Sequence, residues 1–198
     1  MPLSTTEIDT LLTSWASSAA YMSAHSAYSA TGGNELSGGS YARVAVTWGS
    51  ASGGSISLSG SYSINAPASS SVGWVGFWTA SSGGTFLGMI PGGNYTAYTF
   101  TAPASTDTLL APGSATYATN QTVVVFPTAG STLPGGLSAG VVYFAISVSG
   151  DSFELSTTSG GSAINITADG SGIIQAIAVE SFSSAGTYSV TGGQITGV

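Results

Sequence analysis

The 198-residue chain contains no lysine and a single arginine, Arg43, against eight acidic residues, so its net charge is −7. Proteins that bind nucleic acid neutralise phosphates with several Lys or Arg side chains, and attraction to anionic membranes depends on the same residues. The composition therefore argues against a nucleic-acid partner and against a membrane partner. The lack of Lys also removes a P-loop and a Schiff-base catalyst.

Cysteine is absent as well, which excludes disulfides, thiolate metal sites and thiol nucleophiles. The start of the chain has no basic region of a secretory signal, and no stretch approaches the roughly 18 continuous apolar residues of a spanning helix. Only 5% of residues are charged, so the surface must consist of Ser, Thr, Gly, Asn and backbone. Hydrophobic residues make up 42% of the chain and include 4 Trp, so we expect a folded protein.

One helix is predicted, at the N-terminal end. Ser4 and Glu7 have the spacing of a capping box. Apolar residues then recur at spacings of three and four, namely Ile8, Leu11, Leu12, Trp15, Ala19 and Met22. We expect this helix to end between His25 and Gly32, where Ser and Gly take over.

The chain after residue 40 predicts short β-strands separated by Gly- and Ser-rich turns, at 43–48, 55–59, 74–78, 85–90, 95–101, 121–126, 141–148, 152–155, 173–181 and 187–191. Short strands at such spacing are typical of a sandwich or barrel. The predicted fold is mainly β, with an N-terminal helix followed by two small antiparallel β-sandwich or barrel-like domains. The predicted boundaries are 1–30 for the helical segment, 31–103 for the first domain and 104–198 for the second, with a linker near 103–113.

Two stretches, HSAYSATGGNELSGGSYARVAVTW (25–48) and VGWVGFWTASSGGTFLG (72–88), carry a resemblance that covers roughly residues 5 to 90. The chain here resembles a module of tailed-bacteriophage virion proteins, described as minor tail, tail-fibre or capsid-surface proteins. Asn34-Glu35, Gly38 to Arg43 and Val75 to Trp78 match the module, whereas Ala24 and Tyr28 depart from it. A second stretch, 133–172, looks like another small β module of phage virion proteins.

The resemblance implies a non-enzymatic structural protein on a virion, without a catalytic site, cofactor or metal. Its partners would be other virion proteins and further copies of itself, with a trimer expected from family habit. Tail-associated and capsid-decorating roles stay open. A tail adhesin that binds a host receptor or surface glycan is the alternative.

Arg43 is the first candidate functional residue, because it is the only cation in the chain. It is predicted to pair with Glu35, since a guanidinium fork fits a fixed carboxylate. Contact with a receptor is the alternative role. Either role would explain why one positive charge is kept where the surface carries almost none.

Other candidates have weaker patterns. His25 is the only His, so no second imidazole completes a metal site, and we expect a hydrogen-bonded residue at a helix end. Asp151 and Glu154 could suggest a glycosidase pair, but their odd spacing along a strand sends them to opposite faces. Asp169 precedes Gly170, which predicts a turn rather than a calcium site.

Three aromatic residues, Trp74, Phe77 and Trp78, are candidates for a subunit interface or a ligand platform. Alternation along a strand would send Trp74 and Trp78 to one face and Phe77 to the other. One of these sets is therefore expected in the core. The glycan-binding alternative requires the other set to be exposed.

Overall fold

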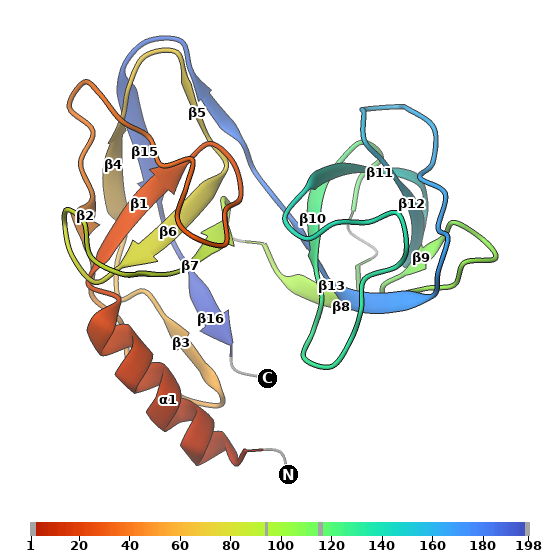
Figure 1. Cartoon of the computed structure of the whole chain (residues 1–198), viewed down its shortest axis with the longest axis horizontal. Helices are drawn as coiled ribbons and strands as arrows, with labels where there is room; N and C mark the ends of the chain where they lie inside the picture. Colours follow the sequence, from red (N-terminus) through yellow and green to blue (C-terminus); the bar gives the residue numbers. More distant parts are fainter. Residues whose placement is uncertain (1–2, 94, 115–116, 197–198) are drawn as a thin grey trace. The chain divides into compact units, whose positions relative to one another are not determined.

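A computed structural model describes residues 3–93, 95–114 and 117–196. The chain divides into two compact units, the first made of Met1–Asn94 with Val179–Val198 and the second of Tyr95–Ala178. The described residues form antiparallel β-sheets with one N-terminal helix (Figure 1), which confirms the predicted fold class. The boundaries of the units differ from 31–103 and 104–198, because the last segment of the chain lies in the first unit.

Helix α1 (Thr5–Ser18) begins with the predicted capping box. The Ser4 hydroxyl accepts a hydrogen bond from the Glu7 N–H, and the Glu7 carboxylate accepts one from the Ser4 N–H at 2.8 Å. The predicted end of the helix between His25 and Gly32 is wrong, since strand β1 (Tyr21–His25) follows almost at once. The apolar pattern here also fits period two, and pairing within a sheet outweighs the helical reading.

The first unit is built on a four-stranded antiparallel sheet in the order β2-β1-β6-β7. Its other strands are β2 (Val44–Ala45), β6 (Trp74–Trp78) and β7 (Phe86–Pro91). Strand β6 lies between β1 and β7, and all five of its residues are buried. The predicted strand at 43–48 is shorter than expected, with an isolated bridge from Trp48 to Leu58 beyond β2.

Three two-stranded sheets complete the first unit; they follow one another along the same two segments of the chain, and we call them together the ribbon. Strands β3 (Ser55–Ser57), β4 (Tyr62–Ala66) and β5 (Ser70–Val72) pair in turn with β16 (Gln194–Thr196), β15 (Gly186–Val190) and β14 (Glu180–Phe182). Figure 1 shows strand β15, from the last part of the chain, running beside β4. The core between this ribbon and the sheet contains Met22, Ala24, Ile64, Val75, Phe77, Tyr188 and Val190.

The second unit is a closed six-stranded barrel in the order β10-β11-β12-β9-β8-β13. The strands are β8 (Ala97–Ala102), β9 (Leu109–Leu110), β10 (Thr122–Phe126), β11 (Val142–Ser149), β12 (Ser152–Ser156) and β13 (Gly170–Ala176). The barrel interior is filled by large apolar side chains, among them Phe100, Val123, Val125, Phe153, Leu155 and Ile174. The predicted strand at 173–181 is therefore two strands, because β13 lies in the barrel and β14 in the first unit.

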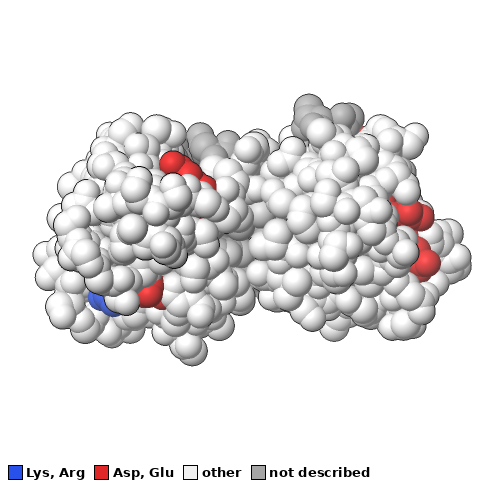
Figure 2. Space-filling model, turned by 90° about the horizontal axis from the view of Figure 1, so that it is seen from above, with Lys and Arg blue, Asp and Glu red and all other residues white. Residues whose placement is uncertain are grey.

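The surface carries little charge. Figure 2 shows a face on which charged atoms form a few small groups in an otherwise uncharged surface. Among the described residues, no helix has the length and apolar character that a bilayer crossing requires.

Candidate functional site

The central strands of the first unit have one apolar face and one polar face. Pairing of Met22 with Phe77 and of Ala24 with Val75 places four apolar side chains in the core. Period two sends the alternate residues of β1 and β6 to the other face, which holds Ser23, His25, Trp74, Gly76 and Trp78. All five are buried, because the loop that follows β1 covers them.

Three hydrogen bonds run through this covered face. The Trp78 indole Nε1–H donates to Ser23 Oγ at 2.8 Å, and Ser23 Oγ lies 2.6 Å from His25 Nε2. His25 Nδ1 lies 2.8 Å from the Gly33 carbonyl oxygen. Since a carbonyl oxygen only accepts, Nδ1 carries a proton. Burial lowers the pKa of His25 below its ordinary value of 6.5 and so favours the neutral imidazole, in which Nε2 accepts from the Ser23 hydroxyl.

The chain of bonds fits only around a residue without a side chain at position 76. A Cβ on Gly76 would lie 2.5 Å from His25 Nε2 and 2.7 Å from Ser23 Oγ. Gly32 in the covering loop is equally restricted, with a positive φ and a Cβ position 2.6 Å from the Trp78 ring. The two glycines let the sheet and the loop close over the imidazole.

Arg43 and Glu35 form a forked ion pair beside this face. Arg43 Nε donates to Glu35 Oε1 at 2.8 Å, and Nη2 donates to Oε2 at 2.7 Å. The Arg43 side chain is 9% exposed and that of Glu35 is 20% exposed. Nη1 donates to the carbonyl oxygens of Ala80 and Gly83, at 3.1 and 2.6 Å, and the guanidinium lies 3.5 Å from the Trp78 ring centre.

The electrostatics of Glu35 follow from these bonds. Burial alone would raise the pKa of its carboxyl, but hydrogen bonds from Arg43 and Tyr41 and the charge of Arg43 hold the pKa below its ordinary value. Tyr41 donates its hydroxyl proton to Glu35 Oε1 at 2.8 Å, and burial together with this bond raises the pKa of the phenol. The Tyr41 oxygen also accepts the Ala24 N–H at 3.2 Å, which joins the ion pair to β1.

These contacts form one unit, which we call the polar cluster: Ser23, His25, Glu35, Tyr41, Arg43 and Trp78. The polar cluster joins β1 and β6 to the loop at 26–43 and to the hairpin turn at 79–85. Arg43 connects the loop at 26–43 to the turn at 79–85, since it binds the Glu35 carboxylate and two carbonyl oxygens of the turn. The arrangement can hold loops in place.

The contact of Ser23 with His25 resembles the nucleophile and base of a hydrolase. Both residues are fully buried, and the other ring nitrogen of His25 faces a backbone carbonyl instead of a carboxylate. A substrate carbonyl would need access to Ser23 Oγ, which already accepts from Trp78. Within the described residues, no group of three His, Asp or Glu side chains is placed to hold a metal ion.

The three candidate aromatics lie inside the first unit. Trp74 is 1% exposed, Phe77 0% and Trp78 9%. Phe77 packs against Trp15 and Trp48 at ring-centre distances of 5.7 and 5.0 Å. Alternation sends these aromatics to two faces of the sheet, yet both faces are covered, so none of the three presents a ring to solvent.

The acidic candidates lie in the barrel, where the Glu154 and Asp169 carboxylates bind groups of the same unit. The Asp151 backbone carbonyl accepts from the Ala111 N–H, whereas the buried Oδ1 of its side chain has no hydrogen-bond partner. The Glu154 carboxylate accepts from the Ser147 hydroxyl at 2.8 Å. Asp169 accepts the Ala104 N–H at 2.7 Å. The contacts of Glu154 and Asp169 are those of strand and turn residues.

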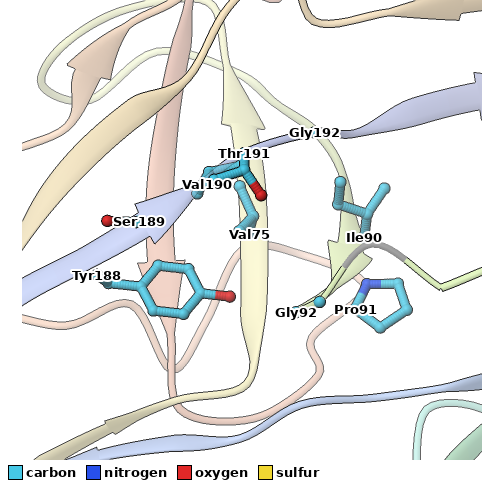
Figure 3. A pocket seen from close by; sticks show the side chains of 10 residues that line it. Val75, Ile90, Pro91, Gly92, Tyr188, Ser189, Val190, Thr191 and Gly192 are labelled. Atoms are coloured by element: carbon cyan, nitrogen blue, oxygen red, sulfur yellow. The ribbon is translucent and has the colours of Figure 1, made fainter.

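The hollows of the first unit differ in size. A small one, shown in Figure 3, has a volume of about 40 Å³ and is lined by Val75, Ile90, Pro91, Tyr188, Val190 and Thr191, among others. This volume suits a few water molecules and is far below that of ordinary ligand pockets. Another is an open groove of about 360 Å³ between α1 and the segment at 46–49, lined by Ala16, Ala20, Val46, Trp48 and Ile56 with neighbouring Ser and Thr.

Sequence reasoning missed Ser23 and Gly76. Period two in Tyr21–His25 would have paired Ser23 with His25 on one face, but the helical reading of this segment hid that pattern. The fit of Gly76 against the imidazole depends on pairing between β1 and β6, which are 50 residues apart. Nothing local to Gly76 marks that contact.

A family model described as Podophage GP4 fiber I protein gp80 matches residues 5–92. No curated protein and no solved structure matches the chain significantly. The matched segment contains every residue of the polar cluster, so the stretches that carried the resemblance are those that meet in this buried network. The resemblance to virion surface proteins is thereby confirmed: residues 5–92 are similar to a phage fibre protein family, and the chain is a component of a tailed-phage virion.

Proposed function

We propose that the protein is a non-enzymatic, tail-associated structural protein that assembles in multiple copies on the virion. The observation that carries this proposal is how the motif residues are used. The side chains of His25, Glu35 and Arg43 all form hydrogen bonds that hold the loops of the first unit in place. A motif used in this way supports a scaffold role, and the fibre description of the matching family favours the tail over the head.

The surface of α1 supports assembly through this helix. Leu12 is its one buried residue, while Leu11 is 58% exposed and Leu3, just before the helix, is 53% exposed. The hydroxyls of Thr10 and Thr13 already donate to helix carbonyls, so their methyl groups are the part of each side chain that is free to pack against a neighbouring molecule. Together with the open groove beside α1, this face suits contact with another copy or with another virion protein.

Particle localisation tests the proposal. Purified virions are labelled with antibody against the barrel or imaged by cryo-electron microscopy, and we expect density at the tail. Density at regular positions on the head would make it a decoration protein instead. Absence from the particle would contradict the structural role.

The copy number has its own test. We expect size-exclusion chromatography with light scattering to show an oligomer, with a trimer as the expected mass. Leu11→Ser should shift the mass towards the monomer. The matched control is Leu110→Ser in β9, since Leu110 is 47% exposed but lies in the barrel. Equal masses for wild type and Leu11→Ser would exclude this face of α1 as the contact.

An adhesin role is the other candidate function. Trp74 and Trp78 do not support this role, since both rings are buried and a glycan could not stack on them. Binding of the intact protein to a glycan array would revive this role with other residues.

A further inference from the structure

The chain returns to the first unit after the barrel. The pairing runs from Ser55 opposite Thr196 to Val72 opposite Glu180, so the C-terminal segment pairs in turn with β3, β4 and β5. It contributes Phe182, Tyr188 and Val190 to the core of the first unit, each at most 9% exposed. Without this segment, the ribbon would lose one of its two strands and the core three side chains.

The chain leaves and re-enters the first unit at neighbouring points. The Gly92 N–H donates to the Gly73 carbonyl oxygen at 2.7 Å, and Glu180 pairs with Val72, the residue before Gly73. Paired residues in a sheet lie about 5 Å apart, so about 15 Å at most separates the two points. Tyr188 lies at the same place, because it lines one small hollow with Gly92 and Gly93 and its hydroxyl points towards Gly92 (Figure 3).

The barrel closes on itself between these points. Its first strand β8 pairs with its last strand β13, with Ala97 opposite Gln175 and Ala102 opposite Gly170. Entry and exit of the barrel are therefore neighbours. Its buried cluster consists of residues between 100 and 176, and a closed barrel has no free strand edge that needs a partner.

The family match stops at residue 92, directly before the chain leaves the first unit. We propose that residues 95–178 are an autonomously folding barrel inserted into a discontinuous first unit, which residues 179–198 complete. The inference goes beyond the proposed function and does not depend on where the protein sits in the virion. It makes the junction between Gly92 and Glu180 the place where a second domain is inserted without change to the fold of the first unit.

The intact chain offers a direct test, because all four Trp residues lie in the first unit and the barrel has none. Urea unfolding is followed by Trp fluorescence, which reports the first unit, and by far-ultraviolet circular dichroism, which reports both units. Ile174→Ala removes a fully buried barrel side chain, and Ile64→Ala removes a fully buried side chain of the first unit. We expect Ile174→Ala to lower the barrel midpoint and leave the Trp midpoint unchanged, and Ile64→Ala to lower the Trp midpoint.

Val190→Ala tests the discontinuous fold. Val190 follows the barrel in sequence but lies in the core of the first unit. The variant Val190→Ala should therefore lower the midpoint of the Trp signal, whereas the control Val125→Ala in β10 should leave that midpoint unchanged. If Ile174→Ala unfolds the barrel completely, the proposal is still supported when the Trp transition keeps its wild-type midpoint. Equal shifts of both signals in Ile174→Ala would overturn the insertion, and an unchanged Trp midpoint in Val190→Ala would overturn the role of the C-terminal segment. Neither result bears on virion location.

Discussion

Replacement of Arg43 is the sharpest test of the polar cluster. In Arg43→Ala the Glu35 carboxylate loses both bonds of the fork, and the carbonyls of Ala80 and Gly83 lose their donor. The ring of Trp78 loses the guanidinium that lies 3.5 Å from its centre. We expect the first unit to be destabilised and the barrel to be unaffected.

The magnitude follows from burial. Removing one partner of a buried ion pair costs about 3–5 kcal/mol, because the other charge stays uncompensated. Glu35 is 20% exposed and keeps its bond from Tyr41, so partial hydration reduces this cost to about 2–4 kcal/mol. Arg43→Lys keeps the charge but loses the fork, and the lost hydrogen bonds predict a smaller cost of about 1–2 kcal/mol.

Urea unfolding followed by Trp fluorescence measures both variants, and Trp78 reports the loss of the guanidinium directly. The order of the free energies of unfolding should be wild type, then Arg43→Lys, then Arg43→Ala. Glu35→Gln in the Arg43→Ala background should recover part of the loss, because it removes the unpaired charge. A loss below about 1 kcal/mol in Arg43→Ala, as for an exposed salt bridge, would refute the reasoning.

Three further predictions concern single positions of the first unit. The free energy of unfolding should fall as the pH drops below about 6.5, because the imidazole is protonated in the unfolded state while the lowered pKa of buried His25 keeps it unprotonated in the folded state. Unfolding monitored by Trp fluorescence from pH 7 to pH 5 should show this decrease, and the variant His25→Asn should not show it. Gly76→Ala should cost about 1–3 kcal/mol by overpacking against His25, whereas the control Gly60→Ala, where a Cβ meets nothing within 4 Å, should be close to neutral in the same assay. Ser4→Ala should cost about 1 kcal/mol through loss of the N-cap, measured as a lower midpoint of the Trp signal, to which Trp15 of α1 contributes.

Each of these has a result that would contradict it. Stability that is flat between pH 7 and pH 5 would mean that His25 takes up a proton without cost. An equal effect of both glycine variants would mean that the cluster yields to a methyl group. An unchanged midpoint in Ser4→Ala would mean that the start of α1 adds nothing to the first unit.

Much of the local structure could be predicted from the sequence. The capping box of Ser4 and Glu7 needs only a spacing of three, and the alternation in Trp74–Trp78 needs only period two, so both are visible in a few residues. The end of α1 could not be predicted in the same way. Met22 satisfies a helical and an alternating pattern at once, and pairing with β6 decides between them.

The candidate site was less predictable than the fold. Arg43 stood out because no other cation exists, and Glu35 was the expected partner from the chemistry of a fork. Ser23 and Gly76 carry no local signal, since their roles arise from a neighbouring strand. The aromatic residues show the same limit, because alternation assigns faces but does not say what covers each face.

The sequence by itself determined the class of protein: few charges, no Cys, short strands between Gly-rich turns, and a motif similar to a phage fibre family. Tertiary structure decided which segments became neighbours. The pairing of β14, β15 and β16 with β5, β4 and β3 joins residues more than 100 positions apart. A strand's alternation is the same whichever partner it finds, so the burial of Phe182, Tyr188 and Val190 in the first unit had to come from the packing of the whole chain.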